Sequence, residues 1–285
     1  MKDTYLVDNY SINCKGNLID LSSPKVMSII NTTPDSFHDG GKHSNMDDLL
    51  RKVELDLSLG ATFIDVGGYS SRPNANKVEE EEEISRTTST IEEILKRFPN
   101  TIISIDTFRG KVASLALDAG ASMINDISAW EMDNKMLETI KKYKVPYVLM
   151  HMKGIPENMQ DNPVYNNLTK DVISFLTKKI TILKKAGIKD IIVDPGIGFG
   201  KTLSHNYELI GNLNIFKTLN LPILLGLSRK SLISKLLNSS SLESINGTTA
   251  LNMYSLNEGV KILRVHDVKE AMECVKIYQE ILNNK

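Results

Sequence analysis

Eight short apolar segments recur along the chain, and each ends in a polar residue or a glycine before a stretch with helical spacing. A repeated strand-then-helix order builds a parallel sheet, and eight such units predict an α/β fold, the (β/α)8 or TIM barrel. In that fold the carboxyl ends of all the strands meet at one mouth, where active sites lie. We therefore expect the functional side chains at these strand ends. The predicted strands cover residues 26–30, 62–66, 102–105, 123–124, 147–150, 191–193, 223–225 and 262–265.

The segments between the strands carry apolar residues at helical spacing, and several of them end at a glycine. One begins with the acidic run 79–83, which we interpret as a solvated first helical turn, because carboxylates suit the positive end of the helix dipole. An acidic interaction patch is the less favoured alternative. The predicted helices cover residues 47–59, 79–98, 111–118, 133–143, 168–186, 205–213, 230–237, 247–256 and 268–282.

Residues 4–20 place apolar side chains on both sides of a Cys14-Lys15-Gly16-Asn17 turn, a pattern typical of a β-hairpin. We expect this hairpin to close the floor of the barrel. A chain of 285 residues suits one barrel, because about 250 residues are typical of the fold. We therefore predict a single barrel domain over 1–285, with residues 1–23 as an N-terminal hairpin extension.

Charge and composition exclude several classes of partner. The formal net charge is -1, so there is no electrostatic footprint for nucleic acid or an anionic membrane. No apolar run approaches the ~20 residues of a membrane-spanning helix, and the first residues lack the apolar core of a signal peptide. Cys14 and Cys274, in segments that we predict to be peripheral, match no disulfide framework or metal motif. These features predict a reduced, cytoplasmic protein without nucleic-acid or membrane partners.

Acid and amide side chains end three of the predicted strands, at Asp106, Asn125 and Asp194. A carboxylate that leaves water needs a partner, so these groups call for a metal or for a ligand rich in N–H donors. A planar heterocycle with a guanidine-like edge would satisfy a carboxylate with two parallel hydrogen bonds. Asn31 ends the first strand, where its amide oxygen could bind a hard cation.

Basic groups follow the last two strands. Arg264 and His266 are two residues apart in an extended segment, so their side chains point the same way. Together with the N-terminus of the predicted helix 230–237, they predict an anion site, which recurs at this place in the fold. The alternative is that Arg264 and His266 pair with neighbouring acids.

Two long polar loops follow the first two strands. The first contains Phe37 and Asp39, and the second contains Gly67, Gly68 and Arg72. Loops of about ten residues without their own secondary structure are more often functional than simple turns. The paired glycines allow close backbone approach to a ligand, and hydroxyls with an arginine suit an oxyanion.

The glycine-rich segment 195–202 is similar to a phosphate-binding P-loop, but Pro195 occupies a position where that loop requires glycine. We interpret the segment as a wall for a planar ligand, with Phe199 available to pack against it.

Together these motifs resemble the dihydropteroate synthases of folate biosynthesis, over about residues 24–282. The family's two signature regions match NTTPDSF at 31–37 and VGGYSSRP at 66–73. Residues 194–201, 228–230 and 264–268 agree as well. The resemblance implies condensation of 6-hydroxymethyl-7,8-dihydropterin diphosphate with 4-aminobenzoate to give 7,8-dihydropteroate and diphosphate. It also implies a Mg²⁺ cofactor, inhibition by sulfonamides and a homodimer.

The resemblance assigns a role to each matching residue. The pterin would be held by Asp106, Asn125, Asp194 and Lys230 and packed by Ile127, Met150 and Phe199. The diphosphate would be held by Ser71, Arg264 and His266. The aminobenzoate site would be shaped by Phe37, Ser71, Arg72, Pro73, Lys230 and Ser231. Mg²⁺ would be bound by Asn31 with help from Asp39, and the catalytic groups would be Lys230, Arg264 and His266.

The second signature departs from the usual family pattern. Tyr69 stands where the family usually has glutamate, Ser71 replaces threonine and Asn74 replaces glycine. Ser71 keeps the hydroxyl that its role requires. The departures bear on the shape of the aminobenzoate pocket and on sulfonamide sensitivity.

Two other functions fit part of the pattern. A pterin-binding methyltransferase domain, which passes a methyl group to a cobalamin protein, would share the pterin-holding acids but need no diphosphate site. Arg264, His266 and the two long loops favour the synthase. A catalytically inactive pterin- or sulfonamide-binding protein is supported only by the altered second loop.

Overall fold

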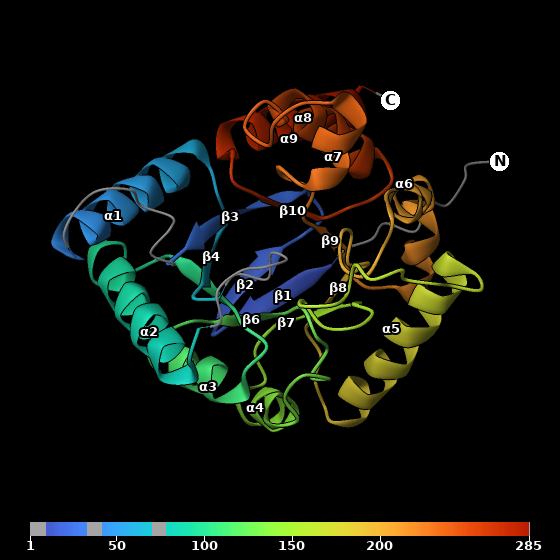
Figure 1. Cartoon of the computed structure of the whole chain (residues 1–285). Helices are drawn as coiled ribbons and strands as arrows, with labels where there is room; N and C mark the ends of the chain where they lie inside the picture. Colours follow the sequence, from blue (N-terminus) through green and yellow to red (C-terminus); the bar gives the residue numbers. More distant parts are fainter. Residues whose placement is uncertain (1–9, 33–41, 70–77, 285) are drawn as a thin grey trace.

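The computed structural model describes residues 10–32, 42–69 and 78–284, with the backbone alone over 42–45. Within these ranges eight parallel strands form one sheet inside a ring of helices (Figure 1). The strands follow the order β8-β7-β6-β5-β4-β3-β10-β9, and a single parallel bridge from Val193 to Ile223 joins the two ends. The predicted (β/α)8 barrel is therefore confirmed.

All eight predicted strands are present, and their bounds agree with the prediction within two residues. β7 (Tyr147–Met150) and β10 (Ile262–Val265) coincide with it. The other strands are β3 (Lys25–Asn31), β4 (Phe63–Gly67), β5 (Ile102–Asp106), β6 (Met123–Asp126), β8 (Ile191–Asp194) and β9 (Leu224–Leu225). β3, β5 and β8 each extend one residue beyond their predicted ends and include the polar residue there, so these polar side chains belong to the strands themselves.

The predicted helices are also present. The clearest difference follows β8, where one helix over 205–213 was expected. Thr202 and His205 form a capping box, because each side chain accepts a hydrogen bond from the other's backbone N–H, so α6 begins earlier and a 3-10 helix, η2, follows. The helices are α1 (Lys42–Leu59), α2 (Glu80–Arg97), α3 (Gly110–Asp118), α4 (Lys135–Tyr143), α5 (Leu168–Lys185), α6 (Leu203–Gly211), η2 (Leu213–Leu219), α7 (Ser231–Leu237), α8 (Ile245–Asn257) and α9 (Val268–Asn283).

Strand side chains alternate between the helices and the barrel interior. Ile64, Ile103 and Ile124 face outward into the main core beneath the helices. Phe63 and Met123 face inward and belong to a separate cluster at the floor of the barrel. Polar side chains that lie two or four residues beyond these inward positions must therefore line the interior nearer the mouth.

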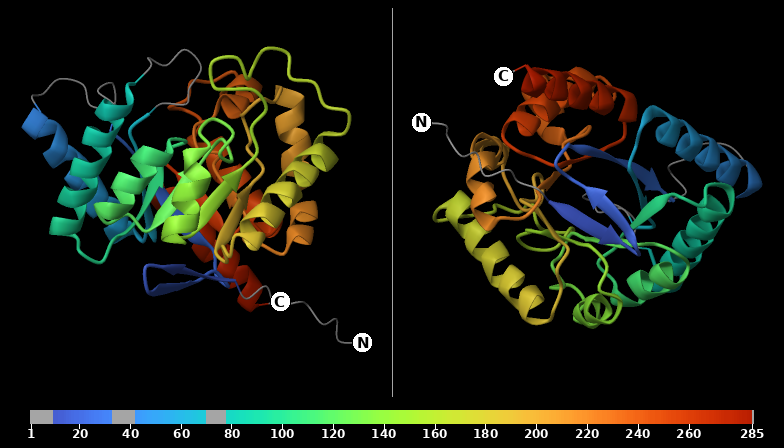
Figure 2. Two further views of the ribbon diagram at one scale, coloured as in Figure 1. Left: turned by 90° about the horizontal axis from the view of Figure 1, so that it is seen from below. Right: turned by 180° about the vertical axis from the view of Figure 1, so that it is seen from behind.

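A hairpin covers the floor, as expected. β1 (Ser11–Cys14) pairs antiparallel with β2 (Asn17–Asp20), and Ile12, Cys14 and Leu21 pack against the inward floor residues. Figure 2 shows the hairpin across the end of the barrel opposite the mouth. The part of the predicted hairpin over residues 4–9 lies outside the described residues.

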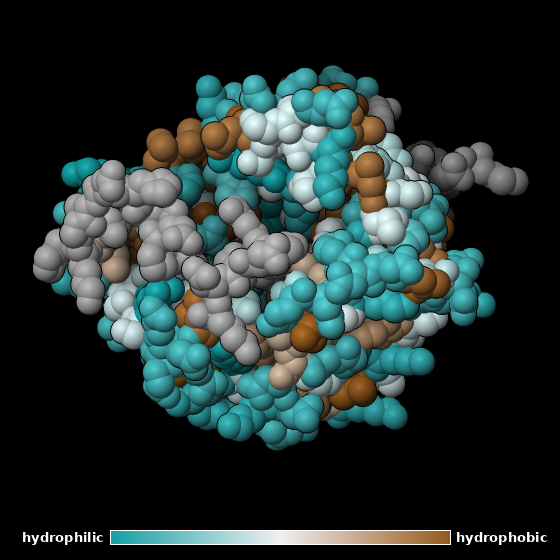
Figure 3. Space-filling view, viewed as in Figure 1, coloured by the Kyte–Doolittle hydropathy of each residue, from teal (hydrophilic) through white to brown (hydrophobic). Residues whose placement is uncertain are grey.

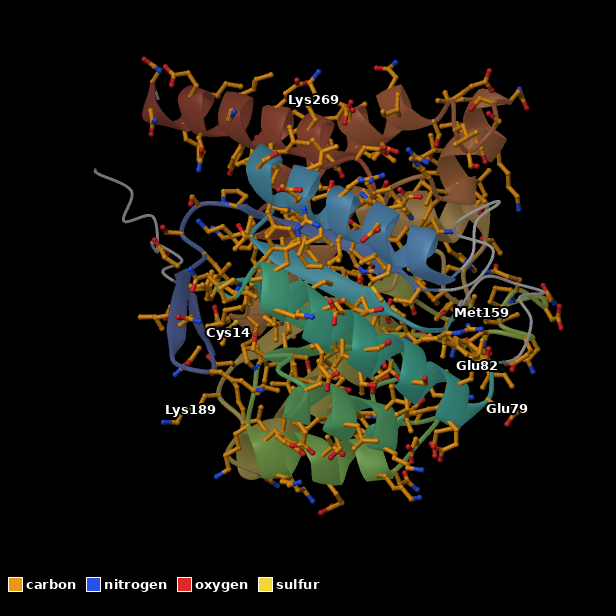
Figure 4. The ribbon with its side chains drawn as sticks, turned by 90° about the vertical axis from the view of Figure 1, so that its left-hand side faces the viewer. Cys14, Glu79, Glu82, Met159, Lys189 and Lys269 are labelled. Atoms are coloured by element: carbon orange, nitrogen blue, oxygen red, sulfur yellow. The ribbon has the colours of Figure 1, made fainter. Side chains whose placement is uncertain are left out.

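The two cysteines are not peripheral in their surroundings, because both thiols are buried. Figure 4 shows Cys14 on the hairpin, at the opposite end of the molecule from Met159. Burial raises the pKa of the Cys14 thiol to about 12, which leaves it protonated and unreactive near neutral pH.

The interpretation of the whole run 79–83 as solvated is wrong for its last residue. Glu79 and Glu82 are exposed at the start of α2 (Figure 4), but Glu83 is fully buried. Its carboxylate accepts hydrogen bonds from Thr107 Oγ1 at 2.6 Å and from Arg109 Nη1 at 2.6 Å. Thr107 and Arg109, on the segment after β5, therefore supply the partners that allow this carboxylate to be buried.

Nowhere in the described ranges does a helix combine the length and apolarity needed to cross a membrane.

Candidate active site

The inward side chains of six strands converge at the mouth, which Figure 3 shows as a hollow at the centre of the face seen in Figure 1. The register explains the convergence, because Asn31 pairs with Gly67, Gly67 with Asp106, and Asp106 with Asn125 on successive strands. Register partners point the same way, so the predicted groups stand in one row. The sequence-predicted residues that these strands bring to the mouth are Asn31, Asp106, Asn125, Met150, Asp194, Arg264 and His266.

Arg264 bridges two carboxylates in the interior. Its Nε donates to Asp65 Oδ2 at 2.6 Å and its Nη2 to Asp106 Oδ2 at 2.5 Å. Burial alone lowers the pKa of Arg264, but the two carboxylates raise it above its ordinary value, so the guanidinium stays charged. The alternative that Arg264 pairs with acids is thus realised in this structure, and one of those acids is an expected pterin ligand.

Asp106 accepts the second bond of Arg264 at the end of β5, and 22% of its side chain is exposed at the mouth. Removal from bulk water raises its pKa to about 7, the Arg264 guanidinium opposes this rise, and the Asp65 carboxylate adds to it. The carboxylate is therefore poised to accept an N–H hydrogen bond near neutral pH and to lose that capacity in mild acid.

Asp65 is a site residue that the sequence interpretation missed. It is fully buried, and its Oδ2 also accepts from Asn125 Nδ2 at 3.0 Å. An available signal was its position two residues before Gly67 in an otherwise apolar strand, since residues two apart share a face. An acid on that face of a barrel strand points into the interior.

His266 contacts the loop after β9. Its Nδ1 lies 3.1 Å from Ser228 Oγ, and its backbone N–H donates to the same oxygen at 3.2 Å. Arg229 on that loop forms a two-bond ion pair with Asp267, at 2.5 and 3.0 Å. These bonds tie the segment that carries Lys230 to the end of β10.

Lys230 reaches back across the mouth to the glycine-rich segment. Its Nζ donates to the backbone carbonyl of Ile197 and lies 4.9 Å from the centroid of the Phe199 ring. Burial lowers the pKa of Lys230 to about 8, Asp194 opposes this fall, and Arg264 adds to it. Asp194 itself accepts from the Gly196 N–H at 2.7 Å, which anchors the same segment at its start.

The glycine-rich segment is held from below by Lys201. This side chain is 2% exposed and donates to the carbonyls of Gly196 at 2.8 Å and Phe199 at 2.9 Å. A P-loop lysine would instead reach outward to a phosphate. The structure therefore agrees with a wall rather than a phosphate loop, and Lys201 had no predicted role.

Apolar side chains form one wall of the mouth. Of the predicted packing residues, Ile127, Met150 and Phe199 all belong to this cluster. The cluster also contains residues that were not predicted: Tyr69, Phe108, Met132, Met152 and Met159.

Tyr69, where the second signature departs from the family pattern, packs edge-on against Phe108 with ring centroids 5.2 Å apart. The Arg109 guanidinium lies 5.5 Å from the Tyr69 ring centroid. Since Arg109 is the partner of buried Glu83, Tyr69 joins the packing between α2 and the segment after β5. Tyr69 therefore contributes an aromatic ring to the apolar wall.

Gly67 keeps space open between two candidate ligands. A Cβ at this position would lie 3.6 Å from Asp106 Oδ2 and 3.8 Å from Asn31 Oδ1.

Ser231 begins α7 and is exposed. The remaining predicted site residues lie outside the described residues: Phe37, Asp39, Ser71, Arg72 and Pro73.

In the part of the chain that the structure describes, no three His, Cys, Asp or Glu side chains are grouped so as to hold a metal ion. A site built wholly from such ligands is therefore not found there. Mg²⁺ commonly uses only one or two protein oxygens and takes the rest from water and substrate phosphates. The amide oxygen of Asn31, at the end of β3, is compatible with that kind of site.

The mouth of the barrel therefore combines buried acids and an amide with the basic groups of Arg264 and Lys230, beside an apolar wall. Comparison with known proteins places the chain in a class of barrel enzymes. The model of the family described as pterin binding enzyme matches residues 27–266. Dihydropteroate synthase of Haemophilus influenzae is 43% identical over 267 residues, which cover 93% of this chain and 96% of that protein.

Solved structures agree over nearly the whole chain. The Yersinia pestis dihydropteroate synthase in a sulfonamide drug complex has a TM-score of 0.90 and 40% identity, covering 97% of this chain and 100% of that one. The Xanthomonas albilineans enzyme in complex with 7,8-dihydropteroate has a TM-score of 0.86 and 33% identity, covering 96% and 99%. The chain belongs to the dihydropteroate synthase family of pterin-binding enzymes.

Proposed function

We propose that this chain condenses 6-hydroxymethyl-7,8-dihydropterin diphosphate with 4-aminobenzoate to give 7,8-dihydropteroate and diphosphate. The observation that carries this proposal is the ion pair between Arg264 and Asp106, because it joins a cation suited to a diphosphate directly to an acid suited to the N–H groups of a pterin. A methyltransferase needs the acid but not the cation. The related synthases, similar over nearly their whole length, also favour the synthase over that alternative.

The pterin ring would bind in the depth of the mouth. Asp106 and Asp194 would accept hydrogen bonds from ring N–H groups, and the Asn125 amide offers both a donor and an acceptor. Lys230 stands across from Asp194, where its ammonium can donate to a ring carbonyl. The wall that contains Ile127, Met150 and Phe199 would pack against the face of the ring.

Departure of the diphosphate is the difficult step. The bond between the pterin methylene and the diphosphate oxygen breaks, and its electron pair leaves with the diphosphate. Arg264 and His266 would stabilise the negative charge that develops on that oxygen. The aromatic amine carries a lone pair at neutral pH, so it attacks the methylene without a strong base and then loses a proton.

The aminobenzoate would bind nearer the rim. Lys230 and Ser231 lie at the start of α7, beyond the strand ends, where they can meet its carboxylate. By family resemblance Phe37, Ser71 and Arg72 shape the rest of this pocket together with Pro73. Sulfonamides, which share the shape of 4-aminobenzoate, are then expected to compete for the same place.

Asn31 would hold Mg²⁺ through its amide oxygen, with Asp39 of the first loop assisting. The ion would neutralise charge on the diphosphate and so make it a better leaving group. Arg264 and His266 address the same charge from the side of β10, and Gly67 leaves room for the diphosphate between Asn31 and Asp106.

We also propose that the enzyme works in the cytoplasm as a homodimer. Large apolar side chains are exposed on neighbouring helices, with Leu236 on α7, Tyr254 on α8 and Ile277 and Ile281 on α9. Figure 3 shows hydrophobic residues over this group of helices at the top of the view. Exposed apolar surface of this kind suits contact with a second copy. Replacing Ile277 and Ile281 together by glutamate should give monomers in sedimentation analysis, and unchanged sedimentation would contradict the proposal.

The test of the reaction is a turnover assay with both substrates that follows released diphosphate and dihydropteroate, with and without Mg²⁺. We expect equal amounts of the two products and little turnover without the metal. Absence of diphosphate release by the folded protein would contradict the proposal. Binding of the pterin without turnover would instead favour an inactive pterin-binding protein.

A further inference from the structure

Asp65 joins the two halves of the mouth through one oxygen atom. It lies in the middle of β4, is fully buried, and faces the barrel interior. Its Oδ2 accepts from Arg264 Nε at 2.6 Å and from Asn125 Nδ2 at 3.0 Å. Arg264 belongs to the diphosphate side of the site and Asn125 to the pterin side.

We propose that Asp65 is a positioning residue, which fixes Arg264 and Asn125 against each other and so sets the spacing between the diphosphate and pterin sites. The inference rests on the proposed function, since that function gives the two partners their roles. Asp65 itself lies beneath both and would touch neither substrate half.

Because Asp65 is fully buried, its carboxylate depends on the few partners around it. A carboxylate without contact to water is costly unless charged or N–H partners surround it, and here a guanidinium and an amide do so. The second oxygen of Asp65, Oδ1, is buried without a hydrogen-bond partner in the described part of the chain. All of the partnering of Asp65 therefore falls on the oxygen that Arg264 and Asn125 share.

The bond to Nε also sets the direction of the guanidinium. Two bonds fix the plane of a guanidinium group, and Arg264 donates one to Asp65 and one to Asp106. With Nε anchored below, the terminal nitrogens are directed toward the mouth, where 21% of the side chain remains exposed. A diphosphate would meet the group in this fixed orientation.

Loss of the Asp65 charge should disturb both sides at once. Arg264 would then depend on Asp106 as its carboxylate partner, in competition with the pterin. The Asn125 amide would face a neutral amide oxygen in place of a carboxylate oxygen, a weaker acceptor that fixes its rotation less firmly. Poor pterin placement raises KM for the pterin diphosphate, and poor placement of Arg264 in the transition state lowers kcat.

The experiment compares Asp65→Asn with Asp126→Asn. Asp126 is the matched control, because it is equally buried but faces away from the mouth and accepts from Ser128, Trp130 and Tyr147. For Asp65→Asn we expect KM for the pterin diphosphate to rise about tenfold and kcat to fall about tenfold, with KM for 4-aminobenzoate changed less than about threefold.

Asp126→Asn should lower the melting temperature but change both constants by less than about threefold per folded molecule, because the Asp126 charge is only a minor contributor to the raised pKa of Asp106. A purely structural role for Asp65 would reproduce that behaviour, since a smaller folded fraction lowers apparent kcat without raising KM. Wild-type constants for folded Asp65→Asn, or a fall in kcat alone that matches the folded fraction, would overturn the inference.

If Asp65→Asn does not fold, Asp65→Glu replaces it, because it keeps the charge and moves the carboxylate by one methylene. The same combined change in KM and kcat is expected, and wild-type constants would again overturn the inference. Failure of the wild-type protein to release diphosphate would contradict the proposed function instead, so the two outcomes are distinct.

Discussion

Lys201 and His151 face each other in the interior, with Lys201 Nζ 3.0 Å from His151 Nδ1. Both side chains are buried beneath the glycine-rich wall. Burial lowers the pKa of Lys201 to about 7 and that of His151 to about 3. At neutral pH the imidazole is therefore uncharged and can accept from the lysine, which is itself close to losing its proton.

This pair predicts a pH dependence of stability. Between pH 7 and 10 the unfolded lysine is protonated and the folded one is not, so the unfolded state binds more protons and stability rises with pH. Lys201 contributes up to about 1.4 kcal/mol per pH unit in this window. Urea unfolding at several pH values should show a smaller slope for Lys201→Met than for the wild type. Lys230, whose pKa is also lowered, adds to the residual slope, and Cys14, whose pKa is raised, opposes it at the alkaline end of the window. Equal slopes for the two proteins would contradict the prediction.

Pterin binding should weaken in mild acid. Below its raised pKa of about 7, Asp106 becomes protonated and loses its capacity to accept an N–H hydrogen bond as a carboxylate. The affinity for 6-hydroxymethyl-7,8-dihydropterin should therefore fall, approaching about tenfold per pH unit below that value. Calorimetry with this alcohol avoids titration of the diphosphate itself. Asp106→Asn should bind weakly with a flatter pH profile, and a wild-type affinity that is constant from pH 5.5 to 8 is incompatible with the assignment.

Gly196→Ala should be strongly destabilising. Gly196 has φ +73°, and a Cβ there would lie 1.8 Å from the carbonyl oxygen of His151. We expect a loss of about 3 kcal/mol or more in the free energy of unfolding, together with loss of pterin binding. Gly187→Ala is the matched control, because Gly187 has φ +81° but open space around a Cβ. It should cost about 1 kcal/mol from backbone strain alone, and similar losses for both variants would refute the packing argument.

Asn31→Ala tests the proposed magnesium site. Loss of the amide oxygen should raise the Mg²⁺ concentration needed for half-maximal turnover by about tenfold. Binding of the pterin alcohol, which lacks the diphosphate, should not change. An unaltered Mg²⁺ requirement would remove Asn31 from the site.

The sequence alone is sufficient to predict the barrel and most of the mouth. Strand ends are readable because apolar runs stop at polar groups, and the alternation of side chains then places Asp106, Asn125 and Asp194 inside. Asp65 was missed because its role depends on Arg264, which lies 199 residues further along the chain.

Glu83 was misread for a similar reason. Its partner Arg109 lies 26 residues away, and a run of acids at a helix start is usually solvated. Lys201 was left without a role because its partners are backbone carbonyls, which no residue pattern reveals. Pairings between distant segments thus set the limit of what local patterns predict.

The hairpin across the floor has a kinetic consequence. With Ile12, Cys14 and Leu21 packed against the inward floor residues, the described part of the chain closes this end of the barrel and leaves the mouth as the way in. A reactant that contacts the strands has to arrive before one that contacts only the rim. The 7,8-dihydropteroate product has to leave through the same mouth by which the two substrates entered, once the groups at the rim release it. An ordered sequence of arrivals and departures therefore follows from the closed end of the barrel.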